Sequence, residues 1–382
     1  MNAAPLVGMV AGEASGDLLG AHLVEALRAR RPDLRFAGIA GPRMIAAGVQ
    51  ALHPMEKLAV RGYVEVLRHY PEIAAIRRQV KRHFLQQAPA LFIGIDAPDF
   101  NLGLAFDLKQ AGITTIQYVS PSIWAWRGER IHFIKRAVDR VLTLFPFEQN
   151  IYAKESIAVS YVGHPLADML ADYPAQAEVR AALGIAGDAP VFTLLPGSRV
   201  SELRAMAALF VATAKLVGDA VPGARFVTPL VNRETRAIFA AALAREPGVT
   251  VMLLDGKSHD AIAAADVVLV ASGTATLETA LLRRPMVITY RMPRLSAWLM
   301  KRRGYLPYVG LPNILAGEFV VPELLLDAAT PPALARALLD LFHDAPRRQR
   351  ISERFAHLLL DLKQDTAQKA AAAIMPYLEK IP

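Results

Sequence analysis

The sequence contains no cysteine in its 382 residues. That absence excludes disulfides, thiolate metal sites and a cysteine nucleophile. None of the nine histidines forms a pair at the helical spacing of a metal site, and no D-x-D acid pair is present to hold a divalent ion under a diphosphate. We therefore expect a site without a metal or other cofactor, in which helix N-termini and arginine balance negative charge.

Long uncharged apolar runs are also missing. The longest apolar window, residues 261–282, contains Asp266 and Glu278, so no transmembrane span is expected. The N-terminal apolar run has no Lys or Arg before it and passes directly into Gly12 and Glu13, which is unlike a signal peptide. These features predict a protein that stays in the cytoplasm.

Two familiar nucleotide fingerprints are absent, since neither G-x-G-x-x-G nor a Walker A sequence occurs. Dehydrogenase and kinase functions therefore lose support. The chain has instead two units in which a short apolar run ends at small residues and meets an acid-rich helix start: LVGMVAGEASGD at 6–17 and VFTLLPGSRVSE at 191–202. Each leaves backbone N–H groups where a phosphate or sugar can bind.

Apolar runs of strand length alternate with helical patterns, which predicts parallel sheets covered by helices. With 53% hydrophobic residues, the chain can bury two cores of ordinary size. Strands are expected near 6–11, 34–39, 90–95, 113–119, 139–144 and 158–162, and then near 190–195, 224–229, 249–254, 266–271 and 285–290.

The predicted fold is α/β, with two Rossmann-like domains facing a cleft. Prolines and glycines between His164 and Ala189 indicate the interdomain linker. We expect an N-terminal domain over 1–165, a nucleotide-binding domain over 166–345, and C-terminal helices over 346–382 that pack back on the first domain or onto a partner subunit.

Two loops of the second half carry groups suited to a diphosphate. Gly197, Ser198 and Arg199 follow a strand and offer backbone N–H groups, a hydroxyl and a forked guanidinium. The segment ASGTATLET at 271–279 places Ser272, Gly273 and Thr274 at a helix start, where anions are favoured.

Glu278 lies one turn inside that second helix. Its carboxylate can accept hydrogen bonds from two hydroxyl groups, as a ribose diol requires. The alternative is a capping or surface acid.

In the first half, the strand at 90–95 runs into Asp96, and Asp99 and Asn101, which we expect to contact substrate, follow within the next turn. Pro98 forces its neighbour to be extended, so the acids are held at the strand's carboxyl end, where open α/β sheets place their sites. A carboxylate there can take a proton from an attacking hydroxyl. The alternative is an Asx turn with both acids solvated.

The loop after the first strand bears Glu13, Ser15 and Asp17, and we expect it to face the same cleft. Glu13 is the second candidate for the base. Trp124 and Trp126 follow another strand and can stack on a sugar or flank acyl chains. The alternative for the tryptophans is that they fill a gap beneath a helix.

The net charge of +8 is unevenly distributed. Residues 283–303 hold seven Arg or Lys and no acid, interleaved with apolar side chains that include Trp298. This pattern is typical of a helix on an anionic membrane surface, and a second basic run covers 77–82. The alternative for either run is a solvated face over an ordinary core.

Nine segments resemble the lipid-A-disaccharide synthase family. In order they are GEASGD (12–17), AGPRM (40–44), GIDAPDFN (94–101), YVSPSIWAW (118–126), VGHPL (162–166), LLPGSR (194–199), ASGTATLE (271–278), YRM (290–292) and LPNILAGE (311–318).

The resemblance implies an inverting glycosyltransferase of the GT-B type, without metal or organic cofactor. It implies transfer from UDP-2,3-diacylglucosamine to 2,3-diacylglucosamine 1-phosphate, forming a β-1,6 bond and releasing UDP at the inner face of the inner membrane. It also implies a homodimer formed by C-terminal exchange.

On this basis, Asp96 is expected to deprotonate the acceptor 6-hydroxyl, with Glu13 as the alternative. Arg199 and Ser198 are expected to neutralise the UDP leaving group, Ser272, Gly273 and Thr274 to meet the diphosphate, and Glu278 to hold the ribose. Asn232 and Asn313 are further candidates for donor contacts.

Two rival functions remain from the sequence. An isomerase like the UDP-GlcNAc 2-epimerases shares the two-domain architecture and predicts activity without a second sugar. A non-enzymatic nucleotide or nucleic-acid binder is suggested by the basic charge and predicts salt-sensitive affinity without UDP release. Neither explains a lipid-compatible segment in a chain with a UDP-type pocket, so we expect no nucleic-acid partner.

Overall fold

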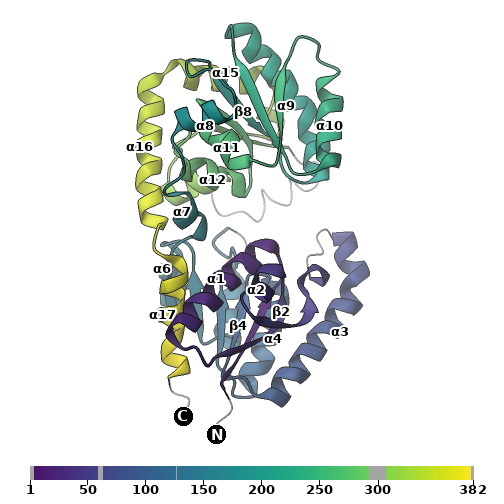
Figure 1. Cartoon of the computed structure of the whole chain (residues 1–382), viewed down its shortest axis with the longest axis vertical. Coiled ribbons are helices and arrows are strands. Elements are labelled where there is room, and N and C mark those ends of the chain that lie inside the picture. Colours follow the sequence, from purple (N-terminus) through teal and green to yellow (C-terminus); the bar gives the residue numbers. More distant parts are fainter. Residues whose placement is uncertain (1–3, 59–62, 126, 292–306, 380–382) are drawn as a thin grey trace. The chain divides into compact units, whose positions relative to one another are not determined.

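The structure is a computed structural model that describes residues 4–58, 63–125, 127–291 and 307–379. The chain divides into two compact units, which are described separately (Figure 1). Unit 1 comprises residues 1–168 and 362–382, and unit 2 comprises residues 169–361. The C-terminal segment of the chain therefore returns to the unit that contains the N-terminus.

Unit 1 is built on a parallel sheet of seven strands in the order β3-β2-β1-β4-β5-β6-β7. The strands are β1 (Leu6–Ala11), β2 (Arg35–Ala40), β3 (Val49–Pro54), β4 (Leu91–Ile95), β5 (Thr115–Tyr118), β6 (Arg140–Thr143) and β7 (Val159–Tyr161). The helices are α1 (Ala14–Arg30), α2 (Pro42–Ala46), α3 (Tyr63–Gln87), α4 (Pro98–Gln110), α5 (Ile131–Ala137), α6 (Glu148–Lys154), α7 (Pro165–Leu170) and α17 (Thr366–Leu378).

Unit 2 repeats the design with six parallel strands in the order β10-β9-β8-β11-β12-β13. Its strands are β8 (Val191–Leu195), β9 (Arg225–Leu230), β10 (Val251–Asp255), β11 (Val267–Ala271), β12 (Met286–Tyr290) and β13 (Glu323–Leu325). Its helices are α8 (Gln176–Ala182), α9 (Val200–Ala220), α10 (Arg233–Leu243), α11 (Ser258–Ala264), α12 (Thr274–Leu281), α14 (Leu311–Ala316), α15 (Pro331–His343) and α16 (Ala345–Leu362).

The prediction of two parallel-sheet Rossmann-like domains is confirmed, and every predicted strand is found within a few residues of its expected place. The sequence prediction missed β3 and β13. Both lie at sheet edges, and their side chains are mostly half-buried or exposed. The uninterrupted apolar signal of a central strand buried on both faces is therefore absent from them.

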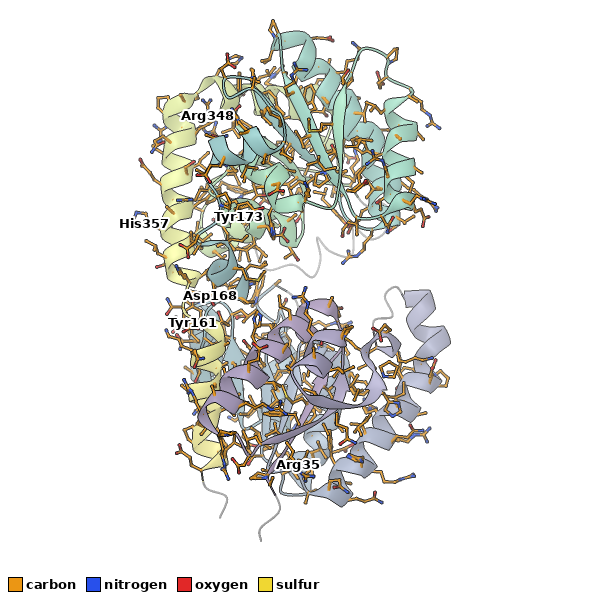
Figure 2. The ribbon with its side chains drawn as sticks, viewed as in Figure 1. Arg35, Tyr161, Asp168, Tyr173, Arg348 and His357 are labelled. Atoms are coloured by element: carbon orange, nitrogen blue, oxygen red, sulfur yellow. The ribbon has the colours of Figure 1, made fainter. Side chains whose placement is uncertain are left out.

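The last helix of the chain belongs to unit 1, where α17 packs against α1 (Figure 1). Its buried face consists of Ala370, Ala371, Ile374 and Leu378, which join the core of that unit. Figure 2 labels Asp168, whose carboxylate accepts hydrogen bonds from the backbone N–H groups of residues 364, 365 and 366 at 2.8–3.0 Å. Within one chain, the helix thus packs back on the first domain.

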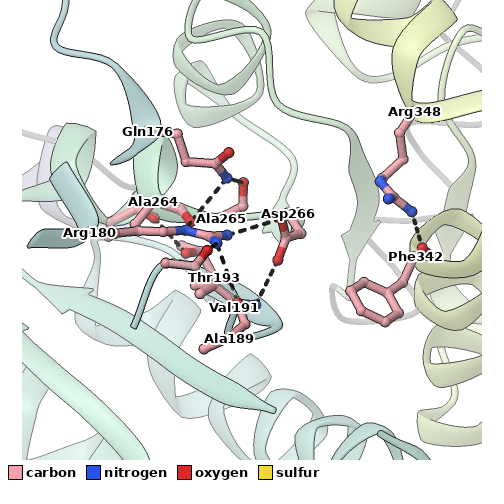
Figure 3. A network of polar contacts seen from close by, with 12 residues as sticks. Gln176, Arg180, Ala189, Val191, Thr193, Ala264, Ala265, Asp266, Phe342 and Arg348 are labelled. Carbon is pink, nitrogen blue, oxygen red and sulfur yellow. Dashed lines mark hydrogen bonds and ion pairs between the residues drawn. The ribbon is translucent and has the colours of Figure 1, made fainter. Parts of the chain in front are cut away.

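A buried arginine ties the start of unit 2 to its sheet (Figure 3). Arg180 on α8 donates to the carbonyl of Ala264 at 2.8 Å and forms an ion pair with Asp266 at 2.9 Å. The other carboxylate oxygen of Asp266 accepts from the N–H of Val191 at 2.8 Å. Because this network lies where β8 and β11 begin, away from their carboxyl ends, its role is structural.

The basic run at 77–82 lies on α3. Ile76, Val80 and Phe84 form the buried stripe of that helix, and Lys81 is paired with Asp107 at 2.9 Å. The run therefore covers an ordinary core while Arg78 and Arg82 remain exposed. The Trp298 segment lies outside the described residues. Among the helices that are described, none combines the length and the apolar character needed to cross a bilayer.

Candidate functional site

The predicted loops occur at equivalent places in the two sheets. In unit 1, chain order reverses between β1 and β4, and in unit 2 it reverses between β8 and β11. Open α/β sheets bind ligands beyond the carboxyl ends of the strands at such switch points. The loops at residues 12–13 and 96–97 stand at this point in unit 1, and those at 196–199 and 272–273 stand there in unit 2.

Unit 2 contains a pocket of about 400 Å³ at its switch point. A larger hollow of about 760 Å³ lies at the opposite ends of β9 and β10, where the sequence places no nucleotide-type loop. The smaller pocket is lined by most of the predicted donor-binding residues, namely Gly197, Ser198, Arg199, Ser272, Gly273, Thr274 and Glu278, with Glu202, Ser258 and Tyr290 as additions.

The loop after β8 is shaped by Glu202, which the sequence analysis did not single out. One carboxylate oxygen of Glu202 accepts the backbone N–H groups of Ser198 and Arg199 at 3.2 and 3.3 Å, and the other accepts Nη1 of Arg199 at 2.7 Å. Gly197 has φ of +115°, and a Cβ atom there would come within 2.7 Å of Glu202. The available sequence signal was an acid in the first turn of the helix, three residues after Arg199.

The loop after β11 leads into α12. Gly273 is exposed at its N-cap, and a Cβ atom added there would meet nothing within 4 Å. The hydroxyl of Thr276 donates to the Gly273 carbonyl at 2.8 Å, which holds the first turn. The α12 N-terminus therefore opens into the pocket with free space before it, as an anion site needs.

Glu278 faces the same pocket from the next turn of α12. Its Oε2 lies 3.2 Å from Nε2 of His259 on α11, and the two side chains are 20% and 30% exposed. His259 was missed by sequence reasoning because it stands 19 residues before Glu278 with no local pattern linking them. At the end of β12, burial raises the pKa of Tyr290, and the nearby Glu202 carboxylate raises it further.

In unit 1, Asp96 and Ala97 form a left-handed turn directly after β4. Their φ angles are +52° and +39°, a region that residues other than glycine rarely adopt. Backbone strain of this kind is found preferentially at functional sites. Asp96 is half-buried at the carboxyl end of the strand, as predicted.

Two buried amides hold this turn. Nδ2 of Asn101 donates to the Asp96 carbonyl at 2.8 Å, and Nε2 of Gln117 donates to the same oxygen at 3.1 Å. Neither side chain is exposed to solvent. Asn101, predicted to contact substrate, is thus fully buried, and its amide holds the backbone of Asp96.

The loop after β1 reaches the same turn, since a Cβ atom at Gly12 would come within 2.6 Å of the Ala97 side chain. Glu13 is half-buried at the N-cap of α1, and Ser15 is exposed. Asp17 is buried and accepts the N–H groups of Arg43 and Met44 at 3.0 Å. Asp17 thus caps α2, while Glu13 and Asp96 come from adjacent strands β1 and β4.

Trp124 is tied to a buried carboxylate. Its Nε1 donates to Oε1 of Glu148 at 3.1 Å, and its ring meets Phe147 edge-on with centroids 5.4 Å apart. Burial raises the pKa of Glu148 to about 7, against the opposing effect of hydrogen bonds from Phe145, Ser120 and Trp124. Trp124 is only partly buried, so one part of the ring is held while another part faces solvent.

Three further predicted residues make polar contacts within the part of the chain that the structure describes. Asn232 caps α10 by accepting the N–H of Thr235 at 2.9 Å. Asn313 is fully buried, and its amide bonds to the backbone of Val321. Asp99 is paired with Arg130. Trp126 lies outside the described residues.

Among the residues described, no three His, Asp or Glu side chains cluster as metal ligands. The charged groups of the unit 2 pocket are instead Arg199, Glu202 and Glu278. This set, with the α12 N-terminus, fits an anionic nucleotide held by arginine and backbone N–H groups.

The two switch-point sheets define the fold class of the GT-B glycosyltransferases. The structure of MurG from Acinetobacter baumannii matches with a TM-score of 0.61 at 14% identity, over 97% of this chain and 99% of that chain. A UDP-GlcNAc 2-epimerase from Neisseria meningitidis, solved with UDP-GlcNAc bound, matches with a TM-score of 0.63 at 12% identity, over 98% and 99%. At these identities the likeness is one of fold alone, and the epimerase alternative rests on nothing more.

The family is established by sequence. A family model described as lipid-A-disaccharide synthetase matches residues 7–376, and the chain belongs to this family. The lipid-A-disaccharide synthase of Dechloromonas aromatica is 55% identical over 99% of this chain and 100% of its own length. That of Methylobacillus flagellatus is 54% identical over 98% and 100%.

Proposed function

We propose that this protein is a lipid-A-disaccharide synthase that transfers diacylglucosamine from its UDP derivative to diacylglucosamine 1-phosphate, with inversion and release of UDP. The observation that carries the proposal is the unit 2 pocket, where Arg199, Glu278 and the α12 N-terminus surround a space of about 400 Å³. Membership of the family supplies the acyl-sugar substrates.

In this proposal unit 2 binds the donor. Arg199 and Ser198 meet the diphosphate with a forked guanidinium and a hydroxyl, and the N–H groups around Gly273 add the helix N-terminus. These groups stabilise the negative charge that develops on UDP as the glycosidic bond breaks. Glu278 accepts the ribose hydroxyls. The reaction as proposed uses no metal or organic cofactor.

Unit 1 supplies the acceptor side. Asp96 takes the proton of the acceptor 6-hydroxyl as that oxygen attacks the anomeric carbon. The left-handed turn and the amides of Asn101 and Gln117 hold Asp96 at the end of β4. Glu13 is the alternative base. Trp124, anchored through Glu148, covers the sugar or its acyl chains.

We further propose that the protein works in the cytoplasm at the surface of the inner membrane, because its substrates are lipids. Arg78 and Arg82 on α3 are exposed and can meet anionic headgroups, and the Trp298 segment carries the same combination of cations and apolar residues. A homodimer is proposed from the family resemblance alone.

The test is UDP release from UDP-2,3-diacylglucosamine in detergent micelles containing EDTA, with and without the acceptor. We expect release that depends on the acceptor and is accompanied by a disaccharide product. Release without acceptor, or no release at all, would overturn the transferase proposal.

A further inference from the structure

His259 contacts the Glu278 carboxylate in the unit 2 pocket. The proposed reaction gives His259 no role. Its Nε2 lies 3.2 Å from Oε2 of Glu278. A carboxylate oxygen is only an acceptor, so this ion-pair contact is attractive when Nε2 of His259 carries a proton. The two residues come from α11 and α12, which contact each other within unit 2.

The histidine is itself held in place. The ring of Tyr173 meets it edge-on at 5.9 Å between centroids, and the Tyr173 hydroxyl donates to Oδ1 of the neighbouring Asp260 at 2.5 Å (Tyr173 is labelled in Figure 2). The chain enters α11 through Gly256 and Lys257, both with positive φ. Ser258 at the first turn lines the pocket.

A carboxylate held in one orientation binds a diol more tightly than one that rotates freely. Two adjacent hydroxyl groups are bound together only when the carboxylate has one rotation, and a partly exposed glutamate otherwise samples several rotamers. The 3.2 Å contact of His259 with one oxygen restricts the rotation of the Glu278 carboxylate. The side chain of Glu278 then loses its conformational entropy on folding and not on ligand binding.

We infer that His259 is a positioning residue that orients Glu278 and thereby gives the pocket its preference for a ribonucleotide over a 2′-deoxyribonucleotide. The inference rests on the proposed donor-binding role of the unit 2 pocket. It assigns to the pair, rather than to Glu278 alone, the recognition of the ribose hydroxyls.

The test compares the affinities of UDP and 2′-deoxy-UDP by titration calorimetry on the full chain. The wild type is expected to prefer UDP. His259→Phe keeps a ring against Tyr173 but removes the donor, so we expect UDP to bind about tenfold more weakly and 2′-deoxy-UDP to change about twofold or less. His259→Gln restores a donor and should recover most of the preference.

The matched control is His357→Phe. His357 is an exposed histidine on α16 that does not line the pocket (Figure 2). It should leave both affinities unchanged. Glu278→Gln should also remove the preference, and adding His259→Phe to it should cost little more, since both changes act on one interaction.

Equal weakening of both nucleotides in His259→Phe would overturn the inference, because a merely structural role affects the whole pocket. An unchanged preference in that variant would overturn it as well. If the wild type binds UDP without preferring it over the deoxy form, the ribose assignment fails while acceptor-dependent disaccharide formation can still stand. If UDP does not bind at all, the proposed function and the inference fall together.

Discussion

Several acidic residues of this protein are held by hydrogen bonds from both near and distant parts of the sequence. Asp96 is fixed through its backbone by Asn101 and Gln117, Glu202 by the loop that it shapes, and Glu148 by Trp124 and Phe145. In each case these hydrogen bonds hold the residue in place. A substitution that removes the charge but keeps the hydrogen bonds should therefore show the effect of the charge alone.

Asp96→Asn removes the proposed base while leaving the left-handed turn, which asparagine also tolerates. We expect turnover of the acylated sugars to fall by about 10²–10⁴-fold. UDP affinity should stay close to the wild-type value, because the pocket of unit 2 is untouched. Steady-state kinetics and calorimetry on the same preparation provide the measurement. Near-normal turnover would shift the role of the base to Glu13.

The raised pKa of Glu148 predicts that the free energy of unfolding depends on pH. Its pKa is raised from 4.5 to about 7 in the folded protein, so the folded state binds more protons than the unfolded state between these values. The contribution of Glu148 is therefore fully present below about pH 4.5 and is lost as pH rises through about 7.

Glu148→Gln is the comparison, because its amide stays neutral at every pH. The stability of the wild type minus that of the variant should decrease from pH 4.5 to about 7, with a slope of at most about 1.4 kcal/mol per pH unit. Urea unfolding at a series of pH values measures the difference. A difference that is constant with pH would contradict the raised pKa.

At the level of elements, helix ends do much of the positioning. The α12 N-terminus opens into the unit 2 pocket, and α4 begins immediately after the turn at Asp96. The N-cap of α17, Asp365, has φ of +54° and makes no side-chain cap. Asp168 from α7 supplies the missing acceptor.

Asp168→Ala should therefore release the start of α17 from unit 1. Three backbone N–H groups lose a charged acceptor, and we expect unfolding free energy to fall by about 2 kcal/mol. Asp188→Ala, at an exposed loop position, is the control and should change stability by less than about 0.5 kcal/mol. Urea midpoints of both variants check the prediction, and equal midpoints would contradict the capping role.

At the level of the whole molecule, the two units have sheets with the same kind of switch point, and we propose that one binds the donor and the other the acceptor. The pocket lined by Arg199, Gly273 and Glu278 is contained in unit 2, and the strained Asp96 turn is contained in unit 1. A ligand that lacks the acceptor sugar should therefore affect one unit selectively.

Saturating UDP should slow amide exchange in the pocket loops of unit 2, near 195–202 and 271–281. Binding at a hundred times Kd stabilises the binding-competent state by about 2.7 kcal/mol. The switch-point loops of unit 1, near 12–17 and 95–101, should exchange at unchanged rates. Hydrogen exchange read by mass spectrometry makes the comparison, and protection confined to the unit 1 loops would contradict the assignment.

The central strands, the two sheets and the family could be read from the sequence because their signals are local. A parallel strand buried on both faces is an apolar run, and the motifs at 12–17, 94–101 and 271–278 are contiguous. The edge strands β3 and β13 lacked that run. The sequence could not show which hydrogen-bond partners the polar side chains would have in the folded chain.

Asn101, Asn232 and Asn313 were predicted to contact substrate, and the structure adds that their amides hydrogen-bond to the backbone of Asp96, Thr235 and Val321. His259 carried no local signal, yet α11 brings it to Glu278. Composition and periodicity are properties of neighbouring residues, and they determined the strands and their loops. The partner of a buried polar group depends on which distant segments meet, so only the packed tertiary structure decided which charges are fixed and which face the ligand.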